Sequence, residues 1–538
     1  MKGQKKIERV LMSVTDKRGL PEFGKFLHDA GCEIISTGGT RHVLMDAGIP
    51  VTEIQTVTGN PEAFGGRMKT ISFAIESALL FDREKDKVEA EALGIQPIDL
   101  VVCNLYPFEM VKKRGADIQE LIENIDIGGP TMIRAAAKNY QWVTTVVDPD
   151  DYPMVMENIS KRGGNTDIET RFKLMRKAFN YTADYDSLIA VTMDERAGEP
   201  TLRFAYEKPE VLRYGENSHQ KGMIYRLRNA PDSLYDMEIL HGKKISYNNM
   251  VDLYGALETV RDLKRTGCAI IKHANPCGLC DGSDQREVFE KAWAGDPVSA
   301  FGSVIAFNKP VTLETTKFLH LDAKDKSQRK FVEILAAPAF DEPALDYLKQ
   351  HKNLRIVLFD PARIQPTYDM KFIYNTLLYQ DTDRQLLEKV EYVSQKKAPV
   401  DEGLMQFGLI AVRQLKSNAI CIARRCENGD YQLLGMGCGQ PNRVNSTQLS
   451  IARCRENLKA EYQGNPQYLE AYIQQKMGEA VLFSDAFFPF PDNVEISYEA
   501  GIRMIVQPGG SIRDMDVIKK VDELEMTLIF TGLRHFKH

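Results

Sequence analysis

The sequence predicts an α/β protein, with a doubly wound parallel sheet at the N-terminus followed by a larger α/β region. Strand and helix signals alternate through the first ~150 residues, an order that places helices on both faces of a parallel sheet. The alternation resumes after about residue 201, with loops richer in Gly, Pro and Asn. A chain of 538 residues also exceeds what one hydrophobic core supports, so two to four domains are expected.

The N-terminal elements follow from apolar runs and from helical spacing. Strands are expected at Arg9–Val14, Glu33–Ser36, Leu100–Asn104 and Trp142–Val147. The last two are continuous apolar runs of the kind found in buried parallel strands. One helical face is formed by Leu20, Phe23, Phe26, Leu27 and Ala30. A short helix is expected from Arg41 to Ala47.

A charged stretch that ends at Pro200 carries helix breakers and follows the mainly helical residues 151–195. We therefore divide the chain into domains 1–199 and 200–538. In the second part, the segments that begin at Cys268 and Ser417 look alike, since each follows a helical stretch and runs into a short apolar strand. A doubled α/β unit would explain this likeness, and so would chance.

The net charge, the apolar runs and the cysteine count indicate which classes of protein this chain does not resemble. The net charge of −6 gives no basic field for nucleic acid, so an anionic substrate must be held by local Lys, Arg and backbone amides. The N-terminus lacks the apolar stretch of a secretory signal, and no apolar run approaches the ~18 residues of a membrane span. Nine cysteines without framework spacing suggest reduced thiols and a cytoplasmic protein.

Two motifs predict an anion cradle at one edge of the N-terminal sheet. STGGT (Ser36–Thr40) lies where a strand ends and a helix begins, so its glycines allow close backbone approach and free amides face an anion. Alone it could be a plain tight turn with an N-cap. SVTDKRG (Ser13–Gly19) brings Thr15, Asp16 and Lys17 to the same edge, where open α/β sheets bind ligands.

Three further segments fall at comparable places. They supply Arg67 and Lys69 from FGGRMKT, Asn104 and Tyr106 from CNLYPF, and Asp126 and Lys138 from IDIGGPTMIRAAAKN. Each Lys alone would be typical of a solvated surface. A Lys, Tyr and Asp set beside a phosphate cradle suits proton transfer on a nucleotide.

The sharpest cluster of the second part is KHANPCG (Lys272–Gly278), which directly follows a predicted strand. A neutral His273 can take a proton from a weak amine nucleophile, and Lys272 can stabilise a developing oxyanion. The alternative to these catalytic roles is that His273 is an ordinary core residue and Lys272 an ordinary surface residue. Support comes from the loops LRYGENSHQ, DPVSAFG, KSN, GQPNR, SDAFFPFPDN and PGGS. The aromatic loop has acids at both ends and can sandwich a flat heterocycle, and PGGS is another strand-to-helix anion cradle.

One rival motif is the P-C-G-L-C run at Pro276–Cys280, the cysteine half of a zinc deaminase signature. That chemistry also needs a His-x-Glu or Cys-x-Glu upstream, and the sequence offers only Cys454–Glu456 far downstream. Two thiolates without further ligands make a poor zinc site, so no catalytic metal is expected.

In their order and over nearly the whole chain, these motifs resemble the bifunctional purine biosynthesis proteins. That family combines phosphoribosylaminoimidazolecarboxamide formyltransferase with inosine monophosphate cyclohydrolase. SVTDK, STGGT, CNLYPF, IDIGG and AAAKN resemble the cyclohydrolase half; RYGEN, KHANPCG, DPVSAFG, SDAFFPF and LRHFKH resemble the transformylase half. The resemblance implies a methylglyoxal synthase-like N-terminal domain and two cytidine deaminase-like subdomains without zinc. It also implies 10-formyltetrahydrofolate as co-substrate and a homodimer with transformylase sites at the subunit interface.

The resemblance also implies roles for individual residues. In the transformylase, His273 would be the base for the substrate amine, Lys272 would assist at the formyl carbonyl, and Asn418 would orient the reacting groups. Nucleotide binding and pocket lining would involve Arg213, Tyr214, Gly302, Glu333, Arg443, Phe487, Asp492, Ser511, Ile512 and Arg534.

In the cyclohydrolase, Lys138 would transfer the proton, helped by Tyr106 and with Asp126 in the site. The nucleotide would contact Thr15, Asp16, Lys17, Thr37, Gly38, Gly39, Thr40, Arg67, Lys69, Thr70, Cys103, Asn104 and Ile127.

The sequence departs from the family pattern after Thr70, where ISFAIESALL replaces the usual Leu-His-Pro segment and puts the loop geometry in doubt. The apolar residues of this segment have the spacing of a helical face, so a packed helix is expected to hold the loop: Ile71, Ala74, Ile75, Ala78 and Leu79. Smaller departures are Ser218, the loop Asn375–Asp381 and Pro491. Two alternative functions stay open. A transformylase with a decayed cyclohydrolase predicts loss of Lys138, Asp126 or the cradle. A non-catalytic nucleotide-binding regulator predicts loss of Lys272 or His273. All these residues are present.

Overall fold

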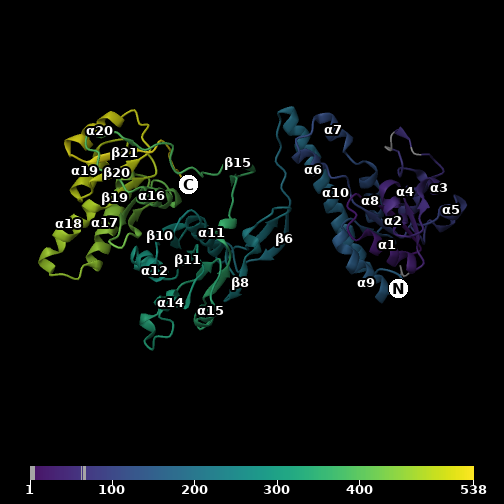
Figure 1. Cartoon of the computed structure of the whole chain (residues 1–538), viewed down its shortest axis with the longest axis horizontal. Coiled ribbons are helices and arrows are strands. Elements are labelled where there is room, and N and C mark those ends of the chain that lie inside the picture. The colour runs from purple at the N-terminus through teal and green to yellow at the C-terminus, as the bar shows by residue number, and fades with distance from the viewer. Residues whose placement is uncertain (1–5, 62, 65–67) are drawn as a thin grey trace. The chain divides into compact units, whose positions relative to one another are not determined.

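The chain forms two compact units, Met1–Ala205 and Tyr206–His538. The computed structural model describes residues 6–61, 63–64 and 68–538 (Figure 1). We refer to these units as unit 1 and unit 2 and describe each separately. The α/β fold class predicted from the sequence is confirmed.

Unit 1 is built on a five-stranded sheet in which every strand pair is parallel. Its order is β3 (Thr52–Glu53), β2 (Glu33–Ser36), β1 (Arg9–Ser13), β4 (Leu100–Cys103) and β5 (Thr144–Val146). The chain leaves β1 in one direction toward β2 and later returns on its other side as β4. The carboxyl ends of β1 and β4 therefore flank the switch point, where open α/β sheets form a crevice.

Helices cover both faces of this sheet, as predicted. Along β1, Val10 and Met12 pack into one apolar cluster while Leu11 packs into the other, because successive strand residues face opposite sides. The main helices are α1 (Leu20–Asp29), α2 (Gly38–Asp46), α4 (Phe73–Leu80), α8 (Gly128–Lys138), α9 (Tyr152–Lys161) and α10 (Ile168–Ala197). Shorter helices are α3 (Ile54–Thr58), α5 (Lys87–Ala92), α6 (Phe108–Lys113) and α7 (Ile118–Glu123).

The expected strands at 9–14, 33–36, 100–104 and 142–147 are present to within two residues at each end. The helix expected from Arg41 begins three residues earlier, at Gly38. Gly38 has a positive φ of 51°, a conformation that glycine adopts without strain, so the helix can start inside the STGGT motif.

Unit 2 is built on a 12-stranded mixed sheet. Its first half contains β8 (Glu238–His241), β9 (Thr266–Lys272), β10 (Asn275–Gly282), β11 (Val304–Phe307), β12 (Ile334–Ala337) and β13 (Arg355–Leu358). Its second half contains β16 (Glu391–Tyr392), β17 (Ile420–Arg425), β18 (Tyr431–Gly437), β19 (Val481–Ser484), β20 (Met504–Gln507) and β21 (Thr527–Phe530).

The two halves repeat one topology, which confirms the doubled unit suggested by the segments at Cys268 and Ser417. The hairpins β9–β10 and β17–β18 correspond, and β9 and β17 are each antiparallel to the following strand, β11 or β19. Parallel strands follow, and β8 or β16 closes each half in the antiparallel direction. The halves join where β10 pairs antiparallel with β18.

Helices α11 (Tyr247–Arg261) and α16 (Glu402–Gln414) share one apolar cluster that spans both halves. The opposite face divides into two clusters, one for each half. The helices there include α12 (Gln285–Ala294), α15 (Glu342–Leu348), α17 (Arg443–Glu461), α18 (Leu469–Glu479), α19 (Asp492–Glu499) and α20 (Asp514–Glu523). Two hairpins form separate two-stranded sheets, β6 (Tyr206–Val211) with β7 (Met223–Leu227) and β14 (Tyr368–Ile373) with β15 (Thr376–Asp381).

Candidate active sites

In unit 1, Asn104 ties together the loops that follow β1 and β4. Its Oδ1 accepts the backbone N–H groups of Thr15 (2.6 Å) and Asp16 (2.9 Å), and its Nδ2 donates to the carbonyl of Asp16 (3.2 Å). Asn104 is buried. Its amide is therefore committed to shaping the switch-point crevice.

The N-terminus of α2 lies beside two lysines. A Cβ added at Gly39 would lie 3.6 Å from Lys17 Nζ, and one added at Gly38 would lie 4.0 Å from Lys69 Nζ. Thr37 is the N-cap residue, and the first amides of α2 are free to face a ligand. Two ammonium groups and the positive end of a helix together favour an anion. We call this place the cradle.

Thr40, in contrast, is buried beneath the cradle. Its Oγ1 accepts the backbone N–H of Val14 and donates to the Val14 carbonyl, both at 3.0 Å. Thr40 therefore joins the loops after β1 and β2, a supporting position that the prediction of ligand contact did not anticipate.

The start of α8 lies against Thr70, the residue that follows Lys69 of the cradle. Thr70 is buried, and its Oγ1 would lie 2.7 Å from a Cβ added at Gly128. Asp126 Oδ1 accepts the backbone N–H of Gly129, in the first turn of α8, at 2.8 Å. Burial raises the pKa of Asp126, while hydrogen bonds from the backbone N–H groups of Gly129 and Tyr106 oppose the rise. A carboxyl of this kind is suited to general acid–base chemistry.

Two tyrosines of α10 support these loops and were missed by the sequence analysis. Tyr181 Oη accepts the backbone N–H of Leu105 (2.9 Å), and Tyr185 Oη accepts that of Asp126 (2.8 Å). Their positions on a long helix far along the chain gave no local signal.

The remaining predicted residues of this site differ in exposure. Tyr106 and Ile127 are exposed. Cys103 ends β4 and is buried, and burial raises the pKa of its thiol. Arg67 lies outside the described residues.

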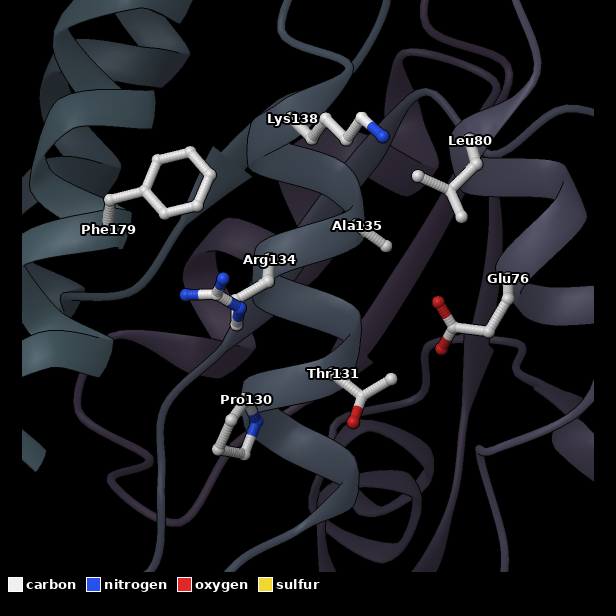
Figure 2. A pocket seen from close by; sticks show the side chains of 8 residues that line it. All are labelled: Glu76, Leu80, Pro130, Thr131, Arg134, Ala135, Lys138 and Phe179. Carbon is white, nitrogen blue, oxygen red and sulfur yellow. The ribbon is translucent and has the colours of Figure 1, made fainter. Parts of the chain in front are cut away.

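Lys138 is not brought to the cradle. It is the last residue of α8, whereas Asp126 precedes the first, and an 11-residue helix spans roughly 15 Å. Figure 2 shows Lys138 at one end of a groove along α8, with Pro130 and Thr131 toward the other end. Glu76 and Leu80 line the α4 side, and Arg134 stacks on Phe179.

The altered segment after Thr70 forms α4, as its helical spacing predicted. Ser72 caps the helix by accepting the backbone N–H of Ile75 (3.2 Å), and Ile75, Ala78 and Leu79 are buried in the core. The loop that carries Lys69 and Thr70 is thus anchored by a packed helix.

In unit 2, Lys272 and His273 stand at the end of β9, as predicted. Lys272 Nζ donates to the carbonyls of Phe301 (3.1 Å) and Gly302 (2.9 Å). His273 has a positive φ and is exposed in the tight turn to β10. Asp252 of α11, which the sequence analysis missed, accepts the backbone N–H of Ala274 at 2.7 Å. Burial raises the pKa of Asp252, and hydrogen bonding and the charges of the turn oppose this.

Glu333 and Gly302 lie at the same edge of the sheet. Gly302 has a φ of 70° and donates its N–H to the Phe331 carbonyl (2.7 Å). Glu333 pairs with the buried Arg355 at 2.5 Å, so its carboxylate is already engaged by the protein.

Asn418 and Arg443 form one buried polar network with Asp485. Arg443 Nη2 donates to Asn418 Oδ1 (2.8 Å), and Nη1 donates to Asp485 Oδ1. Asn418 Nδ2 donates to the Gln440 carbonyl (2.8 Å). Arg443 and Asp485 are both buried, and through this network Arg443 holds Asn418; a direct contact of Arg443 with the nucleotide stays a prediction.

The two halves meet at this edge. Because β10 and β18 pair antiparallel, the β9–β10 turn lies at the same edge as the start of β17 and the end of β18. Asn275 Oδ1 accepts the backbone N–H of Lys416 (3.1 Å), and Asn275 Nδ2 donates to the His273 carbonyl (2.9 Å). The structure therefore brings Lys272 and His273 together with the segment that leads to Asn418.

The other predicted residues lie in loops at the ends of neighbouring elements. Arg213 stacks on Tyr214, and the Tyr214 carbonyl accepts the N–H of Tyr247 at the start of α11. Phe487 and Asp492 are half-buried in the segment after β19, Ser511 and the exposed Ile512 lie between β20 and α20, and the exposed Arg534 stacks on Phe536.

Cys277 and Cys280 are both buried in β10, and burial raises the pKa of Cys277 to about 12 and raises that of Cys280 well above its ordinary value. Cys277 Sγ lies 3.4 Å from the Ile270 carbonyl as a hydrogen-bond donor. In the part of the chain that the structure describes, no group of three or more His, Cys, Asp or Glu side chains is placed to hold a metal ion. No helix among the described residues is long and apolar enough to cross a bilayer.

Comparison with known proteins shows the family of the chain. The family described as "AICARFT/IMPCHase bienzyme" matches residues 136–453, and the "MGS-like domain" matches residues 19–131. The protein named "Bifunctional purine biosynthesis protein PurH" of Persephonella marina is 40% identical over 98% of this chain and 99% of its own length. Its namesakes from Acetivibrio thermocellus (41%) and Bacillus subtilis (40%) each align with 99% of this chain and 100% of their own length. The chain belongs to the AICARFT/IMPCHase bienzyme family and begins with an MGS-like domain.

Proposed function

We propose that the chain catalyses two consecutive steps of purine nucleotide synthesis. The first transfers a formyl group from 10-formyltetrahydrofolate to 5-aminoimidazole-4-carboxamide ribonucleotide. The second closes the ring of the formylated product to inosine monophosphate with loss of water. The observation that carries this proposal is that two separate sheets each gather one set of chemically suitable side chains at a single edge.

Formyl transfer is assigned to unit 2. The exocyclic 5-amino nitrogen of the substrate attacks the formyl carbon and loses a proton to His273. The exposed ring of His273 lies in a turn that Asp252 holds by a hydrogen bond. Lys272 has two of its three donors on backbone carbonyls, which leaves one for the developing oxyanion. The bond from the formyl carbon to N10 of the folate then breaks, and N10 takes up a proton as tetrahydrofolate leaves.

Asn418 orients the reacting groups in this proposal. Arg443 is a donor only and contacts Asn418 Oδ1, so the amide orientation is set by the network. Nucleotide contacts are assigned to the more accessible loop residues Arg213, Tyr214, Phe487, Ser511, Ile512 and Arg534.

Ring closure is assigned to the cradle of unit 1, with the phosphate at the start of α2 between Lys17 and Lys69. The carboxamide nitrogen attacks the formyl carbon within the same molecule, so the enzyme mainly needs to hold the reactive conformer. We assign oxyanion stabilisation to Lys69 and proton transfer to Asp126, because both residues line this region. The role of Lys138 in proton transfer stays a prediction, because α8 separates it from Asp126.

The homodimer is also part of this proposal. The hairpin β14–β15 pairs only within its own two-stranded sheet, and it exposes 81% of Phe372 and 92% of Tyr374. An isolated hairpin with exposed aromatic residues is marginally stable in water, and a second copy of the chain would cover it. Dilution should then lower formyl transfer but not ring closure. A fully active monomer in sedimentation would contradict the dimer.

The direct test supplies purified protein with the carboxamide ribonucleotide and 10-formyltetrahydrofolate, and follows tetrahydrofolate and inosine monophosphate separately. Both should appear, with inosine monophosphate following tetrahydrofolate. Tetrahydrofolate alone would support a decayed cyclohydrolase. Neither product, with the nucleotide still bound, would support a regulator.

A further inference from the structure

The C-terminal tail of the chain lies directly on the segment that carries Asn418. Ser417 donates its backbone N–H to the Lys537 carbonyl (2.9 Å), and the backbone N–H of Lys537 donates to Ser417 Oγ (3.1 Å). Two hydrogen bonds thus clamp residues 120 positions apart in the sequence. This contact is not used in the catalytic roles described above.

The clamp continues into the network of Asn418. Ser417 Oγ donates to Asp485 Oδ2 (2.5 Å), and Asp485 in turn accepts from Arg443, which holds Asn418. The tail makes a second contact here, because the backbone N–H of His535 donates to the Asp485 carbonyl (2.8 Å). Hydrogen bonds between buried groups reinforce one another, and leaving one partner unsatisfied is costly.

Side chains of the tail anchor it on both sides. Lys537 Nζ donates to Gln414 Oε1 of α16 (2.7 Å) and pairs with Glu258 of α11 (3.5 Å). The ring of His535 is buried, with Nδ1 2.8 Å from Asp383 Oδ2 and Nε2 2.9 Å from the Leu386 carbonyl. The tail is therefore fixed to both halves of unit 2.

A short chain of bonds also leads from the tail to the base. Lys416, next to Ser417, donates its N–H to Asn275 Oδ1, and Asn275 holds the His273 carbonyl. The geometry points to Lys537 as a positioning residue for formyl transfer: it clamps Ser417 and so fixes Asn418 relative to His273. This inference rests on the proposed function of unit 2.

The test compares two truncations with the wild-type chain. Removal of Lys537 and His538 breaks the clamp, whereas removal of His538 alone keeps it and is the matched control. The longer truncation should lower kcat of formyl transfer about 10- to 100-fold, since small misplacements of reacting groups cost this much. The KM for the nucleotide should change less than about threefold, and ring closure should be unchanged, because only positioning is lost.

A second pair of variants isolates the side chain and covers the case in which the truncated chain fails to fold. Lys537→Ala should lower kcat, and Lys537→Arg should restore most of it, because a guanidinium can still reach Gln414 and Glu258. A folded longer truncation with full kcat, or equal losses in Lys537→Ala and Lys537→Arg, would overturn the inference. Absence of tetrahydrofolate with the wild-type chain would instead overturn the proposed function.

Discussion

The two candidate sites differ in the groups that form them: free backbone amides and lysines in unit 1, and hydrogen-bonded side chains in unit 2. At the cradle of unit 1, glycines and the start of α2 leave backbone amides free, and Lys17 and Lys69 stand beside them. In unit 2, Asn418 and Arg443 are engaged with each other and with a buried Asp485. We therefore expect a substitution at the cradle to weaken contacts with the ligand, and a substitution in the unit 2 network to displace the side chain of Asn418.

The largest expected effect separates the two sites completely. His273→Ala should lower formyl transfer about 10²- to 10⁴-fold, the usual loss for a general base. Ring closure of added formylated intermediate should be unchanged, because the cradle belongs to unit 1. Steady-state assays of the two half-reactions measure this. Equal loss of both activities in a folded protein would contradict the assignment of two sites.

The two lysines of unit 1 give the next largest effect. Lys69→Ala should lower ring closure about 100-fold, the size of effect seen when one donor to a developing oxyanion is removed. Lys138→Ala should lower it less, because Lys138 ends α8 roughly 15 Å from the residue that begins it.

The measurement is single-turnover ring closure of the formylated intermediate, with release of tetrahydrofolate as the internal control. An equal or larger loss in Lys138→Ala would support Lys138 as the proton-transfer residue. The side chain of Lys138 would then have to contact the bound nucleotide from the C-terminal end of α8.

A glycine pair at the two ends of α2 tests the cradle more finely. Gly38 and Gly48 both have positive φ, so Ala at either position costs about 1–2 kcal/mol of stability. A Cβ at Gly48 meets open space, whereas one at Gly38 faces Lys69. Gly38→Ala should therefore raise the KM of ring closure about tenfold, a change of about 1.4 kcal/mol. Gly48→Ala should match the thermal stability of Gly38→Ala with an unchanged KM. A KM change of the same size in both variants would show that the cradle does not bind the nucleotide at Gly38.

Local features of the sequence predicted the strands of unit 1, the helix after Thr70 and the position of His273 at a strand end, because apolar spacing acts over a few residues. The partners of these elements could not be predicted. Asp252, Tyr181 and Tyr185 hold loops of the candidate sites from distant helices and carry no local signal. The family resemblance implied that Arg443 binds the nucleotide, whereas its contacts with Asp485 and Asn418 are visible only in the packing.

The smallest effect is on stability, and it contrasts two carboxyl groups of unit 1. Burial raises the pKa of Asp126 above 3.8, so the folded state binds its proton more readily than the unfolded state does. This group's contribution to stability is complete at low pH and falls as pH rises through the raised pKa. At pH 7 the buried carboxylate has become a cost, which a neutral amide avoids while its Oδ1 still accepts the Gly129 N–H. Asp126→Asn should therefore be at least as stable as wild type at pH 7, and its advantage should shrink as pH falls.

Asp167 is the matched control, because its pKa is shifted in the opposite direction from that of Asp126. Hydrogen bonds from Asn158 and from the Thr170 N–H lower its pKa to about 2, so its contribution is present above pH 3.8 and lost as pH falls toward 2. Asp167→Asn keeps an N-cap acceptor but removes the negative charge, so it should lose about 0.3–1 kcal/mol at pH 7, the usual worth of such a charge at a helix N-terminus, and the loss should shrink in acid. Urea unfolding followed by Trp142 fluorescence in a Trp293→Phe background reports on unit 1, since Trp293 lies in unit 2. If Asp126→Asn were the less stable variant at pH 7 and recovered in acid, Asp126 would be held as a stabilised anion, and its assignment to proton transfer in ring closure would fail.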